Sequence, residues 1–265
     1  MIIDCHTHIN FEDEDASVVD HFSAEETADA CIVLADYKNT KDLNVNKKLS
    51  EYIKNQGNNK AIGFACIDPT QNPVNTNGVI AVTEKLGLSG IVLYCSACGF
   101  HPAHSRAMML YESAEELGLP VFFHNSGYLR SAAVLDYAQP YLLDEIARTF
   151  PKLKIIIGSM GTPFYPQTLA MIAKHENVYA DLTIKTSSLW QVYNIVISAY
   201  EQGLLGKLFF GSGFPNGTAS QSIEKLLGFN KLLGDANLPT VPRGSICSII
   251  ERDTLGILGL SFGNS

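Results

Sequence analysis

Short apolar runs alternate with longer amphipathic stretches along the whole chain. The runs are rich in β-branched and aromatic residues, and this alternation is typical of parallel strands separated by helices. Eight runs can be counted, and eight strands are the number that closes a (β/α)8 barrel. The predicted strands cover residues 2–6, 31–35, 61–66, 90–94, 121–124, 154–157, 178–182 and 207–210.

The stretches between the runs carry helix signals. Residues Ser23 to Glu26 form a capping box, Ser-Ala-Glu-Glu, which predicts the start of a helix. A second helix is predicted over 105–117, where apolar residues recur at helical spacing until Gly118. The tail from 220 to 260 adds helical pattern with two apolar faces: Leu226, Leu227, Phe229, Leu232 and Leu233 in one, and Leu255, Ile257 and Leu258 in the other.

The length of 265 residues suits a single barrel, since barrels of about 250 residues are ordinary. A hydrophobic fraction of 46% with 17% charged residues indicates a globular chain. We therefore predict an α/β fold, a single-domain (β/α)8 TIM barrel over residues 1–265 with extra C-terminal helices.

Charge and hydropathy exclude several classes of partner. A net charge of −8 and a pI near 5.3 give no basic surface for nucleic acid. No run of 18 apolar residues is present, and the N-terminus has neither a basic region nor a cleavage site. We expect a cytoplasmic protein that binds a small molecule and neither nucleic acid nor membrane.

The six cysteines are scattered, and several lie inside apolar runs, which predicts reduced thiols in the core. Cys95 and Cys98 form a C-x-x-C pair, a spacing found in redox and metal sites. A lone pair of this kind is weak evidence, so a redox role is not favoured.

Three histidines suggest a metal site. Alternate residues of a strand share a face, so Asp4, His6 and His8 point the same way, which in a barrel is inward. His124 ends the fifth run, and the carboxyl ends of barrel strands meet at one mouth. Three imidazoles and a water form a known catalytic zinc arrangement, in which the pKa of the water falls to about 7. We predict that His6, His8 and His124 bind a metal, although a single histidine could equally be a packing residue.

The sequence resembles the amidohydrolase-related family, in the branch that includes aminocarboxymuconate semialdehyde decarboxylase. The likeness runs from Asp4-Cys-His-Thr-His8, through the dense stretch 90–124, to 255–260. The resemblance implies a metal-dependent hydrolase or decarboxylase with a small substrate. It also suggests a homodimer, and it implies a divalent metal, expected to be zinc with manganese and iron as alternatives, on the three histidines and on an aspartate after the eighth strand.

Two positions depart from the family pattern. The family has Gly-Ser-Asp-x-Pro after the eighth strand, whereas this chain has Gly213 in place of the aspartate. The family has Gly-His-x-Gly after the sixth strand, whereas this chain has Ser159 in place of the histidine. The aspartate adds negative charge and takes a proton from water, and the histidine works beside the metal. We therefore expect a metal that is weakly held or absent.

Other residues could support or replace these groups. His101 and His104, in the loop after the fourth run, and Asp36, after the second, are candidates for the catalytic role, although each is also explained as an ordinary loop or helix-start residue. The resemblance gives Asp181 a supporting role, and Asp4 is expected to orient a ligand.

Two functions therefore stay open. One is a metal-dependent hydrolase or lyase with an atypical active site, which the family resemblance favours. The other is a catalytically impaired barrel that binds a ligand or regulates, which Ser159 and Gly213 favour. Fold alone does not decide between them, because function depends on the site.

Overall fold

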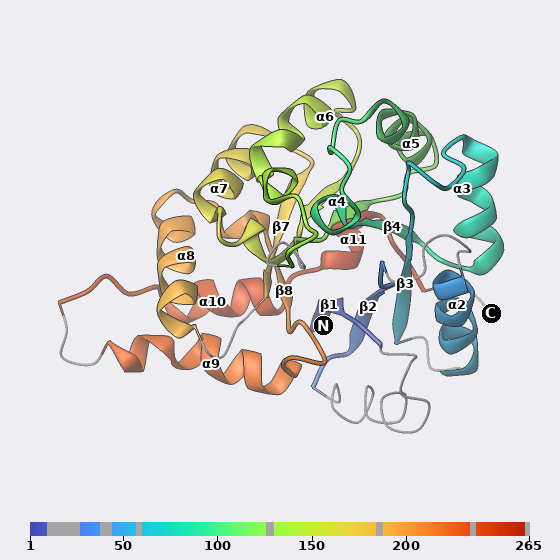
Figure 1. The fold of residues 1–265 in the computed structure, drawn as a ribbon. Helices are drawn as coiled ribbons and strands as arrows, with labels where there is room; N and C mark the ends of the chain where they lie inside the picture. Colours follow the sequence, from blue (N-terminus) through green and yellow to red (C-terminus); the bar gives the residue numbers. More distant parts are fainter. Residues whose placement is uncertain are drawn as a thin grey trace.

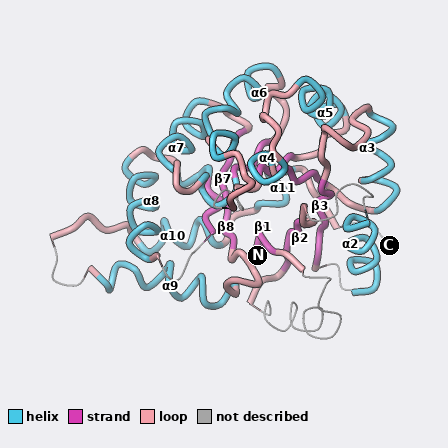
Figure 2. Tube along the Cα trace, viewed as in Figure 1, coloured by secondary structure: helices cyan, strands magenta, loops and turns pink. Residues whose placement is uncertain are grey.

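The computed structural model describes most of the chain, namely residues 1–9, 27–37, 44–56, 60–125, 130–183, 188–233 and 237–262. Its strands form one eight-stranded parallel sheet in which each strand pairs with the next along the chain. The sheet curls into a barrel at the centre of the molecule, and the helices surround it (Figures 1 and 2). The strands are β1 (Ile3–Thr7), β2 (Ala30–Leu34), β3 (Ala61–Cys66), β4 (Gly90–Leu93), β5 (Val121–Phe123), β6 (Ile155–Ile157), β7 (Val178–Thr183) and β8 (Leu208–Gly211).

The predicted fold is confirmed, and each predicted strand agrees with the structure to within one residue at either end. The helix predicted over 105–117 is α5, and Gly118 follows it with a φ of 66°. The capping box at Ser23 lies outside the described residues. The described helices are α2 (Asn44–Gln56), α3 (Thr76–Val82), α4 (Cys95–Cys98), α5 (Ser105–Glu116), α6 (Asp144–Thr149), α7 (Tyr165–Lys174), α8 (Leu189–Glu201), α9 (Ala219–Leu232), α10 (Arg243–Ile250) and α11 (Thr254–Leu258).

The predicted helical tail is α9, α10 and α11. On its first apolar face Leu226 and Leu233 are buried, whereas the side chains of Phe229 and Leu232 lie outside the description. On the second face Leu255 and Leu258 are buried and Ile257 is partly buried. Among the described helices, none has both the length and the apolar character needed to span a membrane.

The barrel closes between β1 and β8 through residues at the carboxyl end of β8. The amide of Gly213 donates to the carbonyl of His6 at 2.9 Å, and the amide of His8 donates to the carbonyl of Phe214 at 2.9 Å. The carboxylate of Asp4 accepts from the amide of Ser212 at 2.9 Å. The seam of the barrel is therefore built from the segment that contains Gly213.

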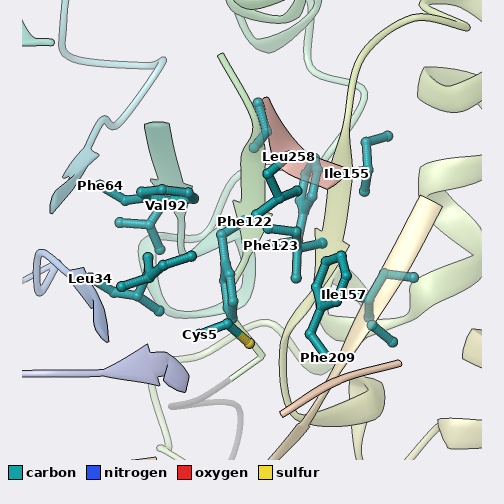
Figure 3. Close-up of a cluster of buried hydrophobic side chains, with 14 of the residues drawn as sticks. Cys5, Leu34, Phe64, Val92, Phe122, Phe123, Ile155, Ile157, Phe209 and Leu258 are labelled. Atoms are coloured by element: carbon teal, nitrogen blue, oxygen red, sulfur yellow. The ribbon is translucent and has the colours of Figure 1, made fainter. Parts of the chain in front are cut away.

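Buried apolar side chains of the strands and of helix α11 form one cluster, part of which Figure 3 shows. Phe122 on β5 and Phe209 on β8 are fully buried there. Leu258 of α11 belongs to the same buried cluster, and the Lys154 ammonium, just before β6, donates to the carbonyl of Ile257. Helix α11 thus covers the amino ends of the strands, which leaves the opposite end for a site.

Replacing Phe122 tests how much the buried side chains of the barrel contribute to the free energy of unfolding. Phe122→Ala removes a buried ring and should lower the free energy of unfolding by about 3–5 kcal/mol, the usual cost of such a cavity. Met109→Ala, at a position that is 51% exposed on α5, should change it by less than about 0.5 kcal/mol. Urea unfolding followed by circular dichroism measures both, and equal losses would contradict this account of the core.

Candidate metal centre

Three imidazoles converge at the carboxyl end of the barrel. The Nε2 atoms of His6 and His124 lie 2.9 Å apart, those of His8 and His124 lie 2.8 Å apart, and those of His8 and His6 lie 3.2 Å apart. His6 and His124 are buried and His8 is partly buried. Within the described residues this is the only group of three or more potential metal ligands whose donor atoms lie within 4.8 Å of one another.

The partners of two imidazoles fix which nitrogen carries the proton. Nδ1 of His8 lies 3.1 Å from the carbonyl oxygen of Leu34, which can only accept, so Nδ1 must carry the hydrogen. Nδ1 of His6 lies 2.6 Å from Oδ2 of Asp181 and donates in the same way. In the neutral form both rings therefore turn an Nε2 lone pair toward the centre of the cluster, where a shared cation would relieve their repulsion.

Asp181 holds His6 through a network of short hydrogen bonds. Its Oδ2 accepts from His6 and from the amide of Ser159, each at 2.6 Å, and its Oδ1 accepts from the hydroxyl of Thr183 at 2.6 Å. The Thr183 hydroxyl also lies 2.9 Å from Nδ1 of His6. A partner of this kind fixes both the ring orientation and the tautomer of a ligating histidine.

This network needs the glycine at position 211. A Cβ atom built on Gly211 would lie 2.5 Å from Oδ1 of Asp181 and 2.9 Å from Cβ of His6. Both distances are shorter than real contacts allow, so a larger residue on β8 would separate the carboxylate from the imidazole.

Two fully buried acids lie behind the imidazoles, Asp181 and Asp4. Oδ1 of Asp4 accepts from the amide of His6 at 3.1 Å as well as from Ser212. Burial raises the pKa of the neighbouring Cys5 thiol, and both acids raise it further, so this thiol stays neutral. The carboxylates give the barrel mouth a negative field, which favours a cation near the three Nε2 atoms.

Tyr94 forms the support of His124. The two rings stack with centroids 4.7 Å apart and planes 24° apart. The Tyr94 hydroxyl donates to the carbonyl of Ala35 at 2.9 Å, and burial raises its pKa, so the phenol stays protonated. Tyr94 therefore holds His124 by packing.

Gly213 and Ser159 both have left-handed backbone conformations. Gly213 has a φ of 70°, and a Cβ atom built there would lie 2.7 Å from Cγ2 of Thr183. Ser159 has a φ of 48° and the next residue, Met160, has a φ of 54°. Non-glycine residues in this region each cost about 1–2 kcal/mol, so the turn must be held by its surroundings. The hydrogen bond from the Ser159 amide to Asp181 is one such restraint.

The remaining candidates do not join the cluster of three histidines. Nδ1 of His104 accepts from the amide of Arg106 at 3.2 Å and so caps α5. Nδ1 of His101 accepts from the amide of Ala103 at 3.0 Å, and its ring meets the edge of Tyr137. Oδ1 of Asp36 accepts from the amide of the next residue at 2.6 Å. His104 thus caps a helix, and His101 and Asp36 form hydrogen bonds within their own loops.

The C-x-x-C pair lies on the one-turn helix α4. Cys95 is buried and Cys98 is partly buried, and all six cysteines are free. Burial raises the pKa of the Cys98 thiol to about 12 and that of Cys95 further. Both thiols are therefore protonated near neutral pH, which makes them poor nucleophiles and poor metal ligands.

Comparison with solved structures shows that the same fold covers almost the whole chain. The sequence identities are low, so the likeness shows a shared fold and no more. A probable 2-pyrone-4,6-dicarboxylic acid hydrolase from Acinetobacter baumannii, with citric acid bound, has a TM-score of 0.68 at 16% identity, covering 98% of this chain and 99% of that one. A 2,6-dihydroxybenzoate decarboxylase from Rhizobium has a TM-score of 0.65 at 13% identity, covering 97% and 98%. A 5-carboxyvanillate decarboxylase from Sphingomonas paucimobilis has a TM-score of 0.63 at 11% identity, covering 98% and 99%.

Sequence comparison gives the family. No curated protein matches the chain significantly. The profile of the Amidohydro_2 family, described as amidohydrolase, matches residues 3–240, which is most of the chain. With its barrel fold, the chain therefore belongs to the amidohydrolase family.

Proposed function

We propose that the protein is a metal-dependent hydrolase or decarboxylase of a small substrate, with an atypical active site on His6, His8 and His124. The observation that carries the proposal is the meeting of three Nε2 atoms within 3.2 Å, two of them with their lone pairs turned inward. The fold and the family support the same class of reaction.

The donor set fits a divalent cation such as zinc. Nitrogens bound to one tetrahedral zinc lie about 3.3 Å apart, given Zn–N distances of about 2.0–2.1 Å, and the observed separations are only slightly shorter. When bound, such a cation polarises a substrate oxygen and lowers the pKa of water. His6, His8 and His124 would hold the cation, while Asp181 and the Leu34 carbonyl keep two of the rings in the ligating tautomer.

Proton transfer is the step that the residues of this proposed site support least. The two oxygens of Asp181 already accept from His6, Ser159 and Thr183, so this carboxylate acts by positioning His6. Gly213 and Ser159 provide no acid or base at the positions where the family has them. General acid–base help is worth about 10²–10⁴-fold, so we expect slow turnover with a metal that is weakly held.

The second candidate function is a barrel that binds a ligand without turning it over. The specific observation in its favour is the backbone of Gly213, whose left-handed φ and nearby Thr183 methyl leave little room for the family aspartate. Both candidates share the same ligand site, and they differ in whether a restored carboxylate can work there.

Zinc titration tests the proposed metal site. The protein should bind one zinc per chain. His8→Ala should weaken the zinc affinity at least about 100-fold, which is more than the loss of a residue that only supports a ligand would cause. His101→Ala, outside the cluster, should leave the affinity unchanged. Isothermal titration with a competing chelator gives the constants, and stoichiometric zinc that survives in His8→Ala would refute the assignment.

Asp181→Asn tests the role of the supporting carboxylate. An amide accepts more weakly than a carboxylate from the imidazole of His6, so zinc affinity should fall about 10–100-fold. Asp253→Asn is the matched control, since Asp253 caps α11 with its side chain and asparagine caps equally well. Equal zinc affinities in the two folded variants would show that Asp181 does not orient a ligand.

Introducing an aspartate at position 213 tests whether this position faces the proposed metal. Gly213→Asp alone should strain the protein, because the new Cβ would meet the Thr183 methyl at 2.7 Å. Thr183→Ser removes that methyl and keeps the hydroxyl, so the double variant Gly213→Asp/Thr183→Ser should bind zinc at least about tenfold more tightly than the parent, because it adds a carboxylate ligand.

The control for this variant is Gly213→Ala/Thr183→Ser, which adds the Cβ atom without the carboxylate. Its zinc affinity should not exceed that of the parent. Equal affinity in the two double variants, with both folded, would mean that position 213 no longer faces the metal. A gain in affinity without measurable hydrolysis or decarboxylation would favour the ligand-binding candidate.

A further inference from the structure

Two Asn-Gly steps occur in the sequence, at Asn77-Gly78 and at Asn216-Gly217. In such a step the amide nitrogen of the glycine can attack the side-chain carbonyl carbon of the asparagine. The glycine has no side chain to shield its nitrogen or to restrict rotation of the backbone. Both asparagines are exposed to solvent, so the backbone around them decides whether either step reacts.

The step at Asn77-Gly78 lies in the first turn of α3, where its backbone is held. The amide of Gly78 donates to Oδ1 of Asn75, the residue that caps the helix, at 2.9 Å. A Cβ atom built on Gly78 would lie 2.5 Å from Cβ of Pro73, so this glycine is also tightly packed. Attack on Asn77 requires the backbone to leave the helical conformation and the amide to leave its acceptor. The helix therefore protects this step.

The step at Asn216-Gly217 lies in the irregular segment between β8 and α9. The amide of Asn216 donates to the carbonyl of Gly213 at 3.0 Å, which anchors the residue on its amino side. Within the described part of the chain, the side chain of Asn216 and the amide of Gly217 form no hydrogen bond. The two reacting groups are thus without the restraints that hold the step in α3.

Packing requires a glycine at position 217. Gly217 is buried, and a Cβ atom built on it would lie 3.1 Å from the carbonyl oxygen of Ser212, which is closer than most real contacts. A larger residue, which would shield the nitrogen, does not fit unless the segment shifts. The reactive pair is therefore a consequence of how this segment packs.

We infer that Asn216 is a site of spontaneous deamidation, with water as the co-reactant. The nitrogen of Gly217 forms a bond to Cγ of Asn216, and Nδ2 leaves as ammonia together with the proton of the Gly217 amide. Water then opens the cyclic imide at either of its carbonyl carbons, which gives aspartate or isoaspartate. Either product adds one negative charge to a chain whose net charge is −8.

The isoaspartate product also changes the seam of the barrel. Its main chain runs through the former side chain, which inserts a methylene group between Gly213 and Thr218. The amide of Gly213 is bonded to the carbonyl of His6, and the Thr218 hydroxyl accepts from the amide of Gln221 at the start of α9. Both ends of the modified segment are fixed, so the seam has to absorb the added length. This effect does not depend on a bound metal.

Peptide mapping by mass spectrometry, after incubation of the protein at mildly alkaline pH, tests the inference. Asn216 should deamidate at least about tenfold faster than Asn77, because reaction at Asn77 requires α3 to open locally. The two asparagines are measured in one sample, so Asn77 is an internal control. Equal rates, or a faster reaction at Asn77, would overturn the inference.

Two variants locate the modification. Asn216→Gln requires closure of a larger, more slowly formed ring, so it should remove most of the acidic species that isoelectric focusing detects in the incubated parent. Asn237→Gln, at an exposed asparagine followed by leucine, should leave that species unchanged. An acidic species that persists undiminished in folded Asn216→Gln would refute the assignment.

Hydrogen exchange measures the effect on the seam. The amides of His8 and Gly213, which close the barrel, should exchange faster in the incubated parent than in incubated Asn216→Gln. Equal exchange at these two amides, in samples where peptide mapping finds isoaspartate at position 216, would refute the effect on the seam.

Discussion

The hydrogen bond between Nδ1 of His6 and Oδ2 of Asp181 is the interaction on which the rest of the site depends. It joins β1 to β7 across the carboxyl end of β8, the strand that follows β7 in the sheet and meets β1 at the seam. The crossing is open only because Gly211 has no side chain, since a Cβ atom would lie 2.5 Å from the Asp181 carboxylate. The lack of a side chain at Gly211 on β8 thus allows the hydrogen bond that fixes the tautomer of His6 on β1.

The segment directly after Gly211 also closes the barrel, through the backbone of Gly213 and Phe214. The amide of Gly213 donates to the carbonyl of His6, the residue that Asp181 orients. Position 213 is therefore tied to the cluster through its backbone and not through a side chain. Closure of the barrel and orientation of His6 therefore do not depend on a carboxylate at position 213.

The spacing of apolar residues was sufficient to predict the fold, because buried strands and the helices between them each produce a local pattern in the sequence. It also indicated that His6 and His8 share a face and that His124 reaches the same mouth. The support of the site was harder to foresee, since Gly211, Tyr94 and the Leu34 carbonyl act through the register of strands far apart in the sequence. Thr183 is the exception: it lies two residues after Asp181 on one strand, so the same alternation rule could have found it.

The turn at Ser159 is tied to the supporting carboxylate of Asp181 through its backbone. Its left-handed backbone is held by the hydrogen bond from the Ser159 amide to Asp181, a contact that does not involve the side chain of residue 159. Histidine is among the residues that tolerate this conformation best, so the turn suits the family residue as well as the serine. The proposed ligands lie on or directly after β1 and β5, whereas Ser159 and Gly213 contact Asp181 and His6 through their backbone amides. In the proposed function, metal binding and proton transfer depend on different residues, so zinc affinity and turnover have to be measured as separate properties of the site.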